Sequence, residues 1–230
     1  MNPIQDVLEL VFPHHCVSCA GEVSESEGPI CLECRRSLPI LLSEKSADSE
    51  ILKEKFTGLL HVTHAIAFLQ FVKGGITQRL LHGLKYGNVP QVGNVLGQIL
   101  AGELKKRGLA NEWDLILPIP LHKKKFHLRG YNQAMQFAEG IASGLKTDVS
   151  DSVLIRTTAT QTQTKKGRLE RFFNVSEVFA VDPNKADLLS GKRILLVDDV
   201  VTTGSTMEAC GKILLNYPIT SLGLATISIA

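Results

Sequence analysis

The chain of 230 residues has no long apolar run and no strong excess of charge of either sign. A bilayer-spanning helix needs about 20 consecutive apolar residues, so we expect no transmembrane segment. The first residues, MNPIQDVLELVFPHHC, lack a basic start and a continuous apolar core, and therefore do not resemble a signal peptide. We expect a cytoplasmic protein. Because the formal charge is only +2, any attraction for nucleic acid must come from local clusters of charge.

What the chain does contain divides it into three regions. Residues 1–40 hold four of the five cysteines and little hydrophobic periodicity, so we predict a small zinc-finger-like module there. Residues 41–60 are polar and charged and are interpreted as a connection. From residue 61 to residue 230, short apolar runs alternate with amphipathic ones, which is typical of an α/β domain with a central, mostly parallel sheet.

Hydrophobic periodicity places the elements of this α/β domain. The predicted strands cover residues 65–71, 114–120, 153–156, 192–197 and 221–229. The predicted helices cover residues 76–86, 92–107, 131–145 and 205–216. Internal glycines in residues 92–107 suggest close packing of that helix against the sheet.

The four N-terminal cysteines have the spacing of a metal site. They form two C-x2-C pairs separated by eleven residues, and they are Cys16, Cys19, Cys31 and Cys34. Four thiolates can close a tetrahedral shell around one Zn²⁺ and leave no position for water, so we predict a structural zinc ion. Disulfide bonds are the alternative, and a reducing compartment disfavours them.

The longest motif in the chain is ILLVDDVVTTGST, residues 194–206. Its apolar start suits a buried central strand, and open α/β sheets bind ligands at the carboxyl ends of their strands. At that edge, Asp198 and Asp199 could accept hydrogen bonds from vicinal sugar hydroxyls. The turn that follows offers backbone N–H groups to a phosphate at a helix N-terminus, and it comprises Thr202, Thr203, Gly204, Ser205 and Thr206. The alternative is a helix-capping turn without a ligand.

Two basic clusters could provide cations to the same ligand. The first follows the strand that ends at Pro120, contains no acid, and consists of Lys123, Lys124, Lys125 and Arg129. It suits a pyrophosphate, although a solvated basic loop is the alternative. The second lies in the polar stretch 156–174, interpreted as a long loop, and includes Lys165, Lys166, Arg168 and Arg171. This loop could close over a ligand as a lid, or it could be an ordinary disordered surface loop.

The motif at residues 194–206 resembles the signature with which type I phosphoribosyltransferases bind phosphoribosyl pyrophosphate (PRPP). This resemblance implies that Asp198 and Asp199 contact the ribose 2- and 3-hydroxyls and that the turn holds the 5-phosphate. With HGLKYGN, PIPLHKKKFHLRGYNQA and the four-cysteine module, nearly the whole chain resembles the ComF family of competence proteins. That resemblance implies a part in natural transformation, with incoming single-stranded DNA and the DNA-uptake machinery as partners.

Two classes of function therefore stay open. An active transferase would displace pyrophosphate at C1 of the ribose, with Mg²⁺ bridging the pyrophosphate and the hydroxyls, and would pass the sugar to an acceptor that the sequence does not identify. A DNA-handling protein would instead keep the PRPP pocket for regulation or structure. Few aromatic residues for stacking bases accompany the basic clusters, and they are Phe126, Tyr131, Phe172 and Phe173.

Overall fold

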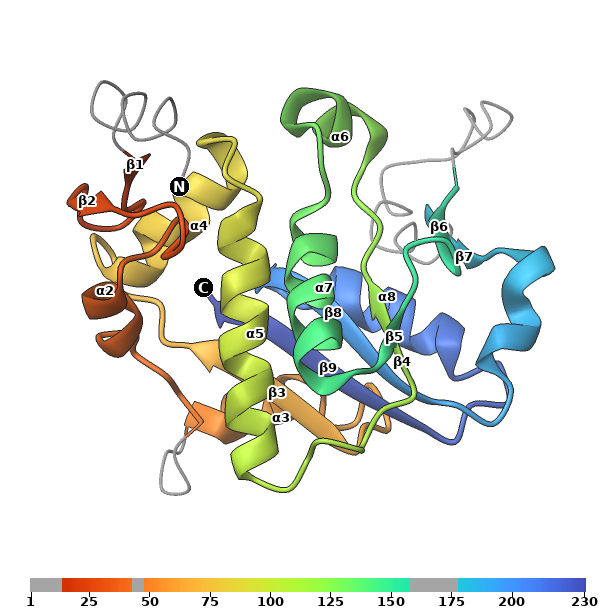
Figure 1. Cartoon of the computed structure of the whole chain (residues 1–230). Helices are drawn as coiled ribbons and strands as arrows, with labels where there is room; N and C mark the ends of the chain where they lie inside the picture. The colour runs from red at the N-terminus through yellow and green to blue at the C-terminus, as the bar shows by residue number, and fades with distance from the viewer. Residues whose placement is uncertain (1–13, 43–47, 158–177) are drawn as a thin grey trace.

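The computed structural model describes residues 14–42, 48–157 and 178–230, and its centre is a parallel five-stranded sheet (Figure 1). The strand order is β3-β9-β8-β4-β5, and every neighbouring pair is parallel. These strands are β3 (His64–Leu69), β4 (Leu115–Pro118), β5 (Asp148–Val149), β8 (Arg193–Val201) and β9 (Ser221–Ile229). The predicted α/β class with a parallel sheet is therefore confirmed.

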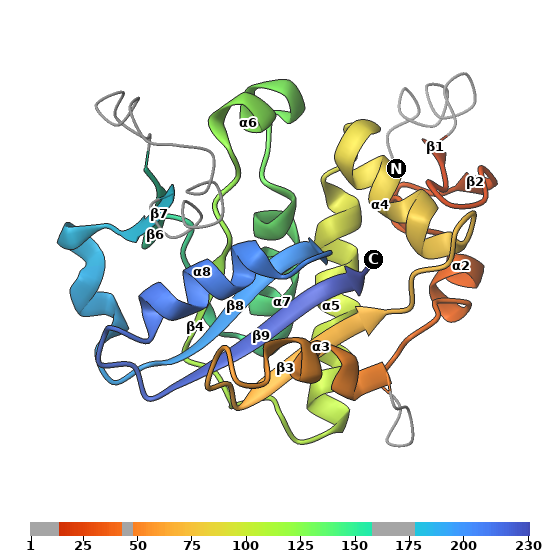
Figure 2. The ribbon, with the colours of Figure 1, turned by 180° about the vertical axis from the view of Figure 1, so that it is seen from behind.

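Helices cover both faces of this sheet (Figures 1 and 2). On one face lie α4 (Ile76–Tyr86), α5 (Gln91–Lys106) and α7 (Gln133–Leu145), and on the other lie α3 (Asp48–Phe56) and α8 (Ser205–Leu214). Successive residues of β8 point to opposite faces: Leu195 and Val197 join the core under α5 and α7, whereas Leu196 joins the core under α3 and α8. Burial on both faces explains why this strand is apolar at nearly every position.

The glycines of α5 permit close packing, but against α7 and not against the sheet. A Cβ at Gly97 would lie 2.3 Å from the carbonyl oxygen of Phe137, and a Cβ at Gly140 would lie 2.1 Å from that of Asn94. Both separations are too short for a real side chain, so the two helix backbones touch because these residues are glycines. The sequence suggested that these glycines allow close packing against the sheet; α5 does cover the sheet, but its glycines face α7.

Several predicted elements differ from the structure in extent or pairing. Strand β8 continues through the acid pair to Val201, because this part still pairs with β9. Strand β5 was not predicted. Strand β6 (Leu154–Arg156) pairs with β7 (Phe179–Val181) in a separate antiparallel ribbon, outside the main sheet. A 3-10 helix, η4 (Pro183–Leu189), then leads toward β8.

The predicted polar connection contains a helix that belongs to the core. In α3, Leu52 and Phe56 are fully buried among residues that include Met207 and Cys210 of α8. Periodicity alone was insufficient here, because charged residues make up much of this short helix and obscure the buried positions Leu52 and Phe56. The boundaries proposed for the three regions stay predictions.

The four-cysteine module is built from β1 (His14–His15), β2 (Glu22–Val23) and α2 (Leu32–Arg36). It packs against α4: a Cβ at Gly83 would lie only 2.3 Å from Cγ1 of Val17. Ile30 and Cys34 of the module share one hydrophobic core with Leu80 of α4. The module is therefore joined to the main domain through α4. Within the described residues, no helix combines the length and the apolar character that a membrane span needs.

An ion pair joins the amino-terminal ends of β4 and β8. Arg193 donates to Asp114 through Nε (2.9 Å to Oδ2), through Nη2 (2.6 Å to Oδ1) and through its backbone N–H (2.9 Å to Oδ2). These hydrogen bonds lower the pKa of Asp114 below its ordinary range. The ionised carboxylate is therefore favoured in the folded state, and its stabilisation is present above the ordinary aspartate pKa and lost as the pH falls toward the folded value.

We expect Asp114→Asn to be less stable than the wild-type protein at pH 7. The difference in the free energy of unfolding should shrink as the pH is lowered from roughly 5 to 2, because the carboxylate is protonated there in the unfolded wild-type chain while it stays ionised in the folded one. Urea unfolding across this pH range measures the difference. Asp151→Asn, at an exposed position, is the control. A difference that stays constant with pH would contradict this account of the ion pair.

Candidate functional site

The acid pair and the hydroxyl turn lie together at the carboxyl end of β8. Asp198 and Asp199 lie near the carboxyl end of β8, where Asp198 pairs with Thr226 of β9. Gly204 has a φ of +84°, a left-handed conformation that glycine adopts readily, and α8 begins at the next residue. The N-cap residue Gly204 has no side chain to cap α8, and the N–H of Ser205, the first residue of the helix, donates a hydrogen bond to Oγ1 of Thr203 (3.4 Å). This is the geometry that suits an anion.

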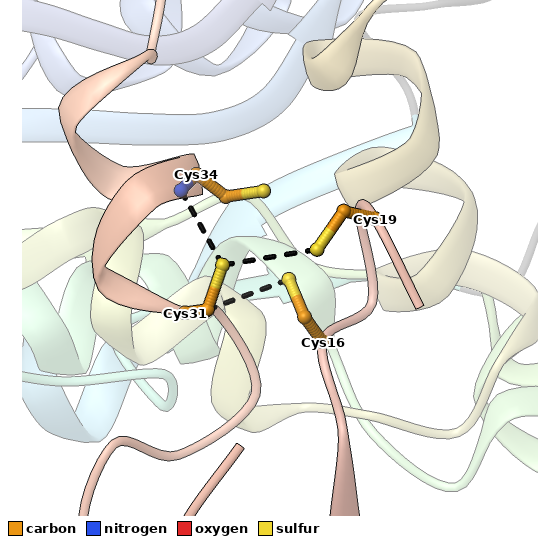
Figure 3. Close-up of side chains that lie close together, drawn as sticks. All are labelled: Cys16, Cys19, Cys31 and Cys34. Carbon is orange, nitrogen blue, oxygen red and sulfur yellow. Dashed lines mark hydrogen bonds between the residues drawn. The ribbon is translucent and has the colours of Figure 1, made fainter. Parts of the chain in front are cut away.

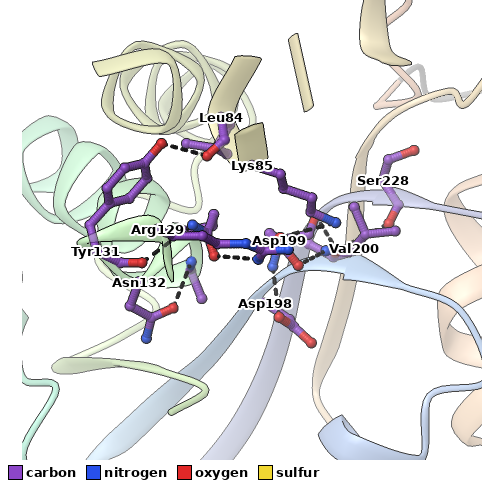
Figure 4. A network of polar contacts seen from close by, with 12 residues as sticks. Leu84, Lys85, Arg129, Tyr131, Asn132, Asp198, Asp199, Val200 and Ser228 are labelled. Atoms are coloured by element: carbon purple, nitrogen blue, oxygen red, sulfur yellow. Dashed lines mark hydrogen bonds and ion pairs between the residues drawn. The ribbon is translucent and has the colours of Figure 1, made fainter. Parts of the chain in front are cut away.

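A network of hydrogen bonds fixes the two carboxylates (Figure 4). The N–H of Asp199 donates to Oδ1 of Asp198 (2.8 Å), and the N–H of Val200 donates to Oδ1 of Asp199 (2.7 Å). Lys85, from α4, places Nζ 3.1 Å from Oδ2 of Asp199. The side chains of this ion pair are mostly buried, with exposed fractions of 22% for Lys85 and 15% for Asp199.

The electrostatics of the pair favour a proton on one of the acids. Burial of its carboxyl and the nearby charge of Asp199 raise the pKa of Asp198 well above its ordinary value. The N–H of Asp199 and the ammonium of Lys85 act in the opposite direction. A buried carboxyl with a raised pKa, next to a second acid at the wall of a cavity, is typical of a functional site.

A cavity of about 350 Å³ opens beside the acids. Its charged lining residues are Lys85, Lys125, Arg129, Arg156, Asp198 and Asp199. Thr206 of the predicted turn also lines it. Of the predicted basic cluster, Lys125 and Arg129 thus reach the cavity, whereas Lys123 and Lys124 are exposed and are not among its lining residues.

The turn itself lines a second, smaller hollow of about 40 Å³ next to this cavity. The predicted phosphate-binding residues all line it, and they are Thr202, Thr203, Gly204, Ser205 and Thr206. Asp198 lines both hollows. The residues predicted to hold the ribose and the 5-phosphate are therefore contiguous in space, and their role stays a prediction.

The first basic cluster is a helix and not the loop that the sequence suggested. Helix α6 (Lys123–Arg129) projects from the domain and buries none of its residues (Figure 1). It begins at His122, whose Nδ1 accepts from the N–H of Lys124, and it ends at Gly130 in the left-handed conformation. These two local caps explain a helix that hydrophobic periodicity cannot detect.

Arg129 is held at the base of α6 by its neighbours. Its Nη1 donates to Oε1 of Gln133 (2.8 Å), and its guanidinium lies 5.4 Å from the ring centroid of Tyr86. In the part of the chain that the structure describes, its buried Nε has no hydrogen-bond partner. A buried donor without a partner at the wall of a cavity is available to a ligand.

Two cavity cations were missed by sequence reasoning. Lys85 lies within the motif HGLKYGN, but a lysine near the end of a helix is ordinarily a surface residue. Arg156 is the last residue of β6, and its guanidinium lies 4.9 Å from the ring centroid of Phe179. Burial lowers the pKa of Arg156. The proposed lid residues Lys165, Lys166, Arg168 and Arg171 fall outside the described residues.

The four module cysteines converge as their spacing predicts (Figure 3). Their sulfur atoms all lie within 4.8 Å of one another, and all are free thiols. The N–H of Cys31 donates to Sγ of Cys16 (3.4 Å), and the N–H of Cys34 donates to Sγ of Cys31 (3.4 Å). N–H groups directed at sulfur stabilise thiolates, so the residues fit a metal ion such as zinc. Disulfide bonds, the alternative, are absent.

Hydrogen bonding gives two of the four thiols different pKa values. Although burial opposes ionisation, backbone N–H groups lower the pKa of Cys16 to about 6. Burial and the hydrogen bond with Cys31 raise the pKa of Cys34 to about 12. A zinc ion would replace the proton on the second thiol, so metal binding should weaken as the pH falls.

Lys85 provides a direct test of the cavity. We expect Lys85→Met to weaken the binding of an anionic sugar ligand about tenfold, because the acid pair loses its fixed cation. Since Lys85 lowers the pKa of Asp198, the variant should also lose affinity at a higher pH than the wild type as the pH is reduced. Calorimetric titrations between pH 5.5 and 8.5 measure both effects.

Two further variants control this experiment. Lys85→Arg keeps the charge and should retain most of the affinity. Lys105→Met removes an exposed lysine of α5 and should have no effect. Equal affinities and equal pH profiles in Lys85→Met and Lys105→Met would show that Lys85 has no part in the site.

Comparisons with known proteins show one matching family and several similar proteins. Residues 131–228 match the family described as the phosphoribosyl transferase domain. Competence protein F of Haemophilus influenzae is 23% identical over 218 residues, covering 88% of this chain and 91% of that protein. Competence protein ComFC of Bacillus subtilis is 26% identical over 202 residues, covering 87% and 77%.

A second group of relatives is matched over a shorter part. DNA utilization protein YhgH of Escherichia coli O157:H7 is 28% identical over 154 residues, and the match spans 65% of this chain and 63% of that protein, less than two thirds of its length. Among solved structures, glutamine PRPP amidotransferase from B. subtilis, complexed with ADP and GMP, has a TM-score of 0.43 and 20% identity. It covers 60% of this chain and 26% of the amidotransferase chain.

Proposed function

Because this chain is a member of the ComF family and carries a phosphoribosyl transferase domain, we propose that its cavity binds PRPP together with Mg²⁺. The observation that carries the proposal is the arrangement at the end of β8. An acid pair, a hydroxyl turn at the N-terminus of α8 and a group of cations surround contiguous hollows. Each part matches one part of PRPP: hydroxyls for the acids, the 5-phosphate for the turn and the pyrophosphate for the cations.

The charge of the cavity supports a polyanion. Four cations, Lys85, Lys125, Arg129 and Arg156, line it with the two acids. A sugar that carries a single phosphate group would not need this number of cations. The two arginines can donate two parallel hydrogen bonds to one phosphate, which a lysine cannot.

The chain's own residues would position the sugar. Asp198 and Asp199 would orient the ribose hydroxyls, and the ion pair with Lys85 would hold the side chain of Asp199 in place. Arg129 and Arg156 would receive the pyrophosphate. Mg²⁺, when bound with PRPP, would neutralise the pyrophosphate and make it a better leaving group. If the protein is an active transferase, these residues provide positioning and charge stabilisation, and no nucleophile of the chain is required.

Calorimetry with the full chain tests the proposal. Titration with PRPP and Mg²⁺ should give saturable binding, and omission of Mg²⁺ should weaken it. Ribose 5-phosphate and magnesium pyrophosphate, each alone, should bind more weakly because each occupies only part of the site. Folded protein that gives no binding signal with PRPP and Mg²⁺ would contradict the assignment.

A second proposal concerns cytoplasmic handling of single-stranded DNA during DNA uptake. Helix α6 supports it, since Phe126 and Leu128 are 47% and 80% exposed beside the lysines Lys123, Lys124 and Lys125. Tyr86, 66% exposed, lies under Arg129 at the base of this helix. Exposed rings beside cations suit unpaired bases and their phosphates.

Retention of labelled single-stranded DNA tests this second proposal. Binding should weaken steeply with salt, and replacing the three lysines by Ala should flatten the salt dependence. Phe126→Ala should weaken binding without a change in the salt dependence. Undiminished binding in the triple variant would remove α6 from the DNA-contacting surface.

A further inference from the structure

Helix α3, more than a hundred positions before the hydroxyl turn in the chain, contacts that turn directly. The ammonium of Lys55 donates a hydrogen bond to the carbonyl oxygen of Thr202. The ring of Phe56 covers Gly204, where a Cβ would lie 3.1 Å from Cζ and 3.2 Å from Cε1 of the ring. Lys55 itself is close, since its Cδ would lie 3.4 Å from the same Cβ.

The position of Lys55 is fixed by the packing of its helix. Leu52 and Phe56, on the inner side of α3, are 0% and 1% exposed. They join the core that also contains Met207 of α8, and α3 and α8 cover the same face of the sheet (Figure 2). Leu60, which follows α3, packs so closely on α8 that a Cβ at Gly211 would lie 2.7 Å from its Cδ1. Lys55 is thus held at the turn by a rigid helix.

The residues of the hydroxyl turn do not provide a positive charge for a bound phosphate. Residues 202–206 carry hydroxyls and backbone N–H groups but no charged side chain. The ionisable residue that lines the same hollow is an acid, Asp198, which offers no positive charge to a phosphate dianion. The turn by itself therefore offers a phosphate only neutral donors, whereas the ammonium of Lys55, which bonds to Thr202, adds a positive charge next to it.

We propose that Lys55 is a phosphate-binding residue, which α3 supplies to the hydroxyl turn and which provides the positive charge for the 5-phosphate of the ribose. This inference rests on the proposed function of the site. It extends the site to α3, which precedes the phosphoribosyl transferase domain in the sequence. It also assigns Lys55 and the cations that line the larger cavity to different ends of the ligand. Lys55 serves the 5-phosphate, whereas Arg129 and Arg156 serve the pyrophosphate.

Calorimetry with the two halves of PRPP tests this division. Lys55→Met should weaken the binding of ribose 5-phosphate about tenfold, and should leave magnesium pyrophosphate unchanged. Lys55→Gln keeps a hydrogen-bond donor for Thr202 without the charge, so it should show the same loss. Lys55→Arg should recover most of the affinity. Lys53→Met removes an exposed lysine of the same helix and should bind as the wild type does.

The possible outcomes separate this inference from the proposed function. If wild-type protein binds PRPP and Lys55→Gln binds ribose 5-phosphate as well as Lys53→Met does, the role of Lys55 is wrong and the pocket assignment survives. If Lys55→Gln loses both ligands equally while Lys55→Arg recovers neither, Lys55 is only structural, which also overturns the inference. Absence of PRPP binding in the wild type overturns both proposals.

Discussion

Replacing Asp198 and Asp199 together by Asn should lower the affinity for PRPP with Mg²⁺ by at least about 100-fold, because an ionised acceptor of a hydroxyl contributes more than a neutral amide does. Asn has nearly the same shape as Asp, so the strand and its pairing with β9 should survive. The substitution also leaves Lys85 without its carboxylate partner, which adds an unpaired, mostly buried cation to the loss.

Single variants and a surface control complete this experiment. Because Asp198 has the raised pKa and Asp199 is the partner of Lys85, we expect Asp199→Asn alone to cost more affinity at neutral pH than Asp198→Asn alone. Asp151→Asn, at an exposed position, should bind normally. Thermal unfolding of each variant verifies the fold. Unchanged PRPP affinity in the folded double variant would contradict the assignment of the acids to the ribose.

Replacing Cys16 and Cys34 together by Ser should remove the zinc that we expect the purified protein to carry, about one ion per chain. Two of the four ligands are lost, and serine hydroxyls do not replace thiolates at this ion. We expect the midpoint of thermal unfolding to fall by roughly 5–10 °C, because metal binding contributes directly to folding. Metal analysis by mass spectrometry and calorimetric melting measure the two effects.

The fifth cysteine provides the control for the zinc prediction. Cys210 lies buried in α8, and burial raises the pKa of its thiol far above the ordinary value, so it is a core residue with no tendency to ionise. Cys210→Ala should therefore keep the full metal content, whatever its effect on stability. Equal metal content in the double Ser variant and in Cys210→Ala would show that the four-cysteine cluster is not the zinc site.

The double Ser variant should also affect the cavity, because α4 contacts the module and also lines the cavity. Val17 packs on Gly83, and two residues later Lys85 reaches Asp199. Between them, the carbonyl oxygen of Leu84 accepts a hydrogen bond from the hydroxyl of Tyr131 (2.6 Å). Loss of zinc should therefore weaken PRPP binding as well as the fold.

Helices and strands could be predicted where residues close together in the sequence indicate them. Helix α4 and strand β9 have the limits that periodicity predicts, and β8 was placed correctly at its start. Strand β5 has only two residues, and its strand character comes from pairing with β4, so nothing local indicates it. Helix α6 has no buried side, so caps alone define it. Helix α3 was missed because its two buried residues stand among charged ones.

The sequence by itself determined the chemistry of the site: an acid pair and a hydroxyl turn after a buried strand, and four cysteines at metal-binding spacing. These motifs lie within contiguous segments, so neighbouring positions in the chain are neighbours in space. Only the tertiary structure decided which cations join them. Lys85, Arg156 and Lys55 come from elements whose positions depend on the packing of buried residues such as Leu80, Phe179 and Phe56. Such contacts between distant segments leave no periodic pattern in a single sequence, and the packing that creates them exists only in the folded chain.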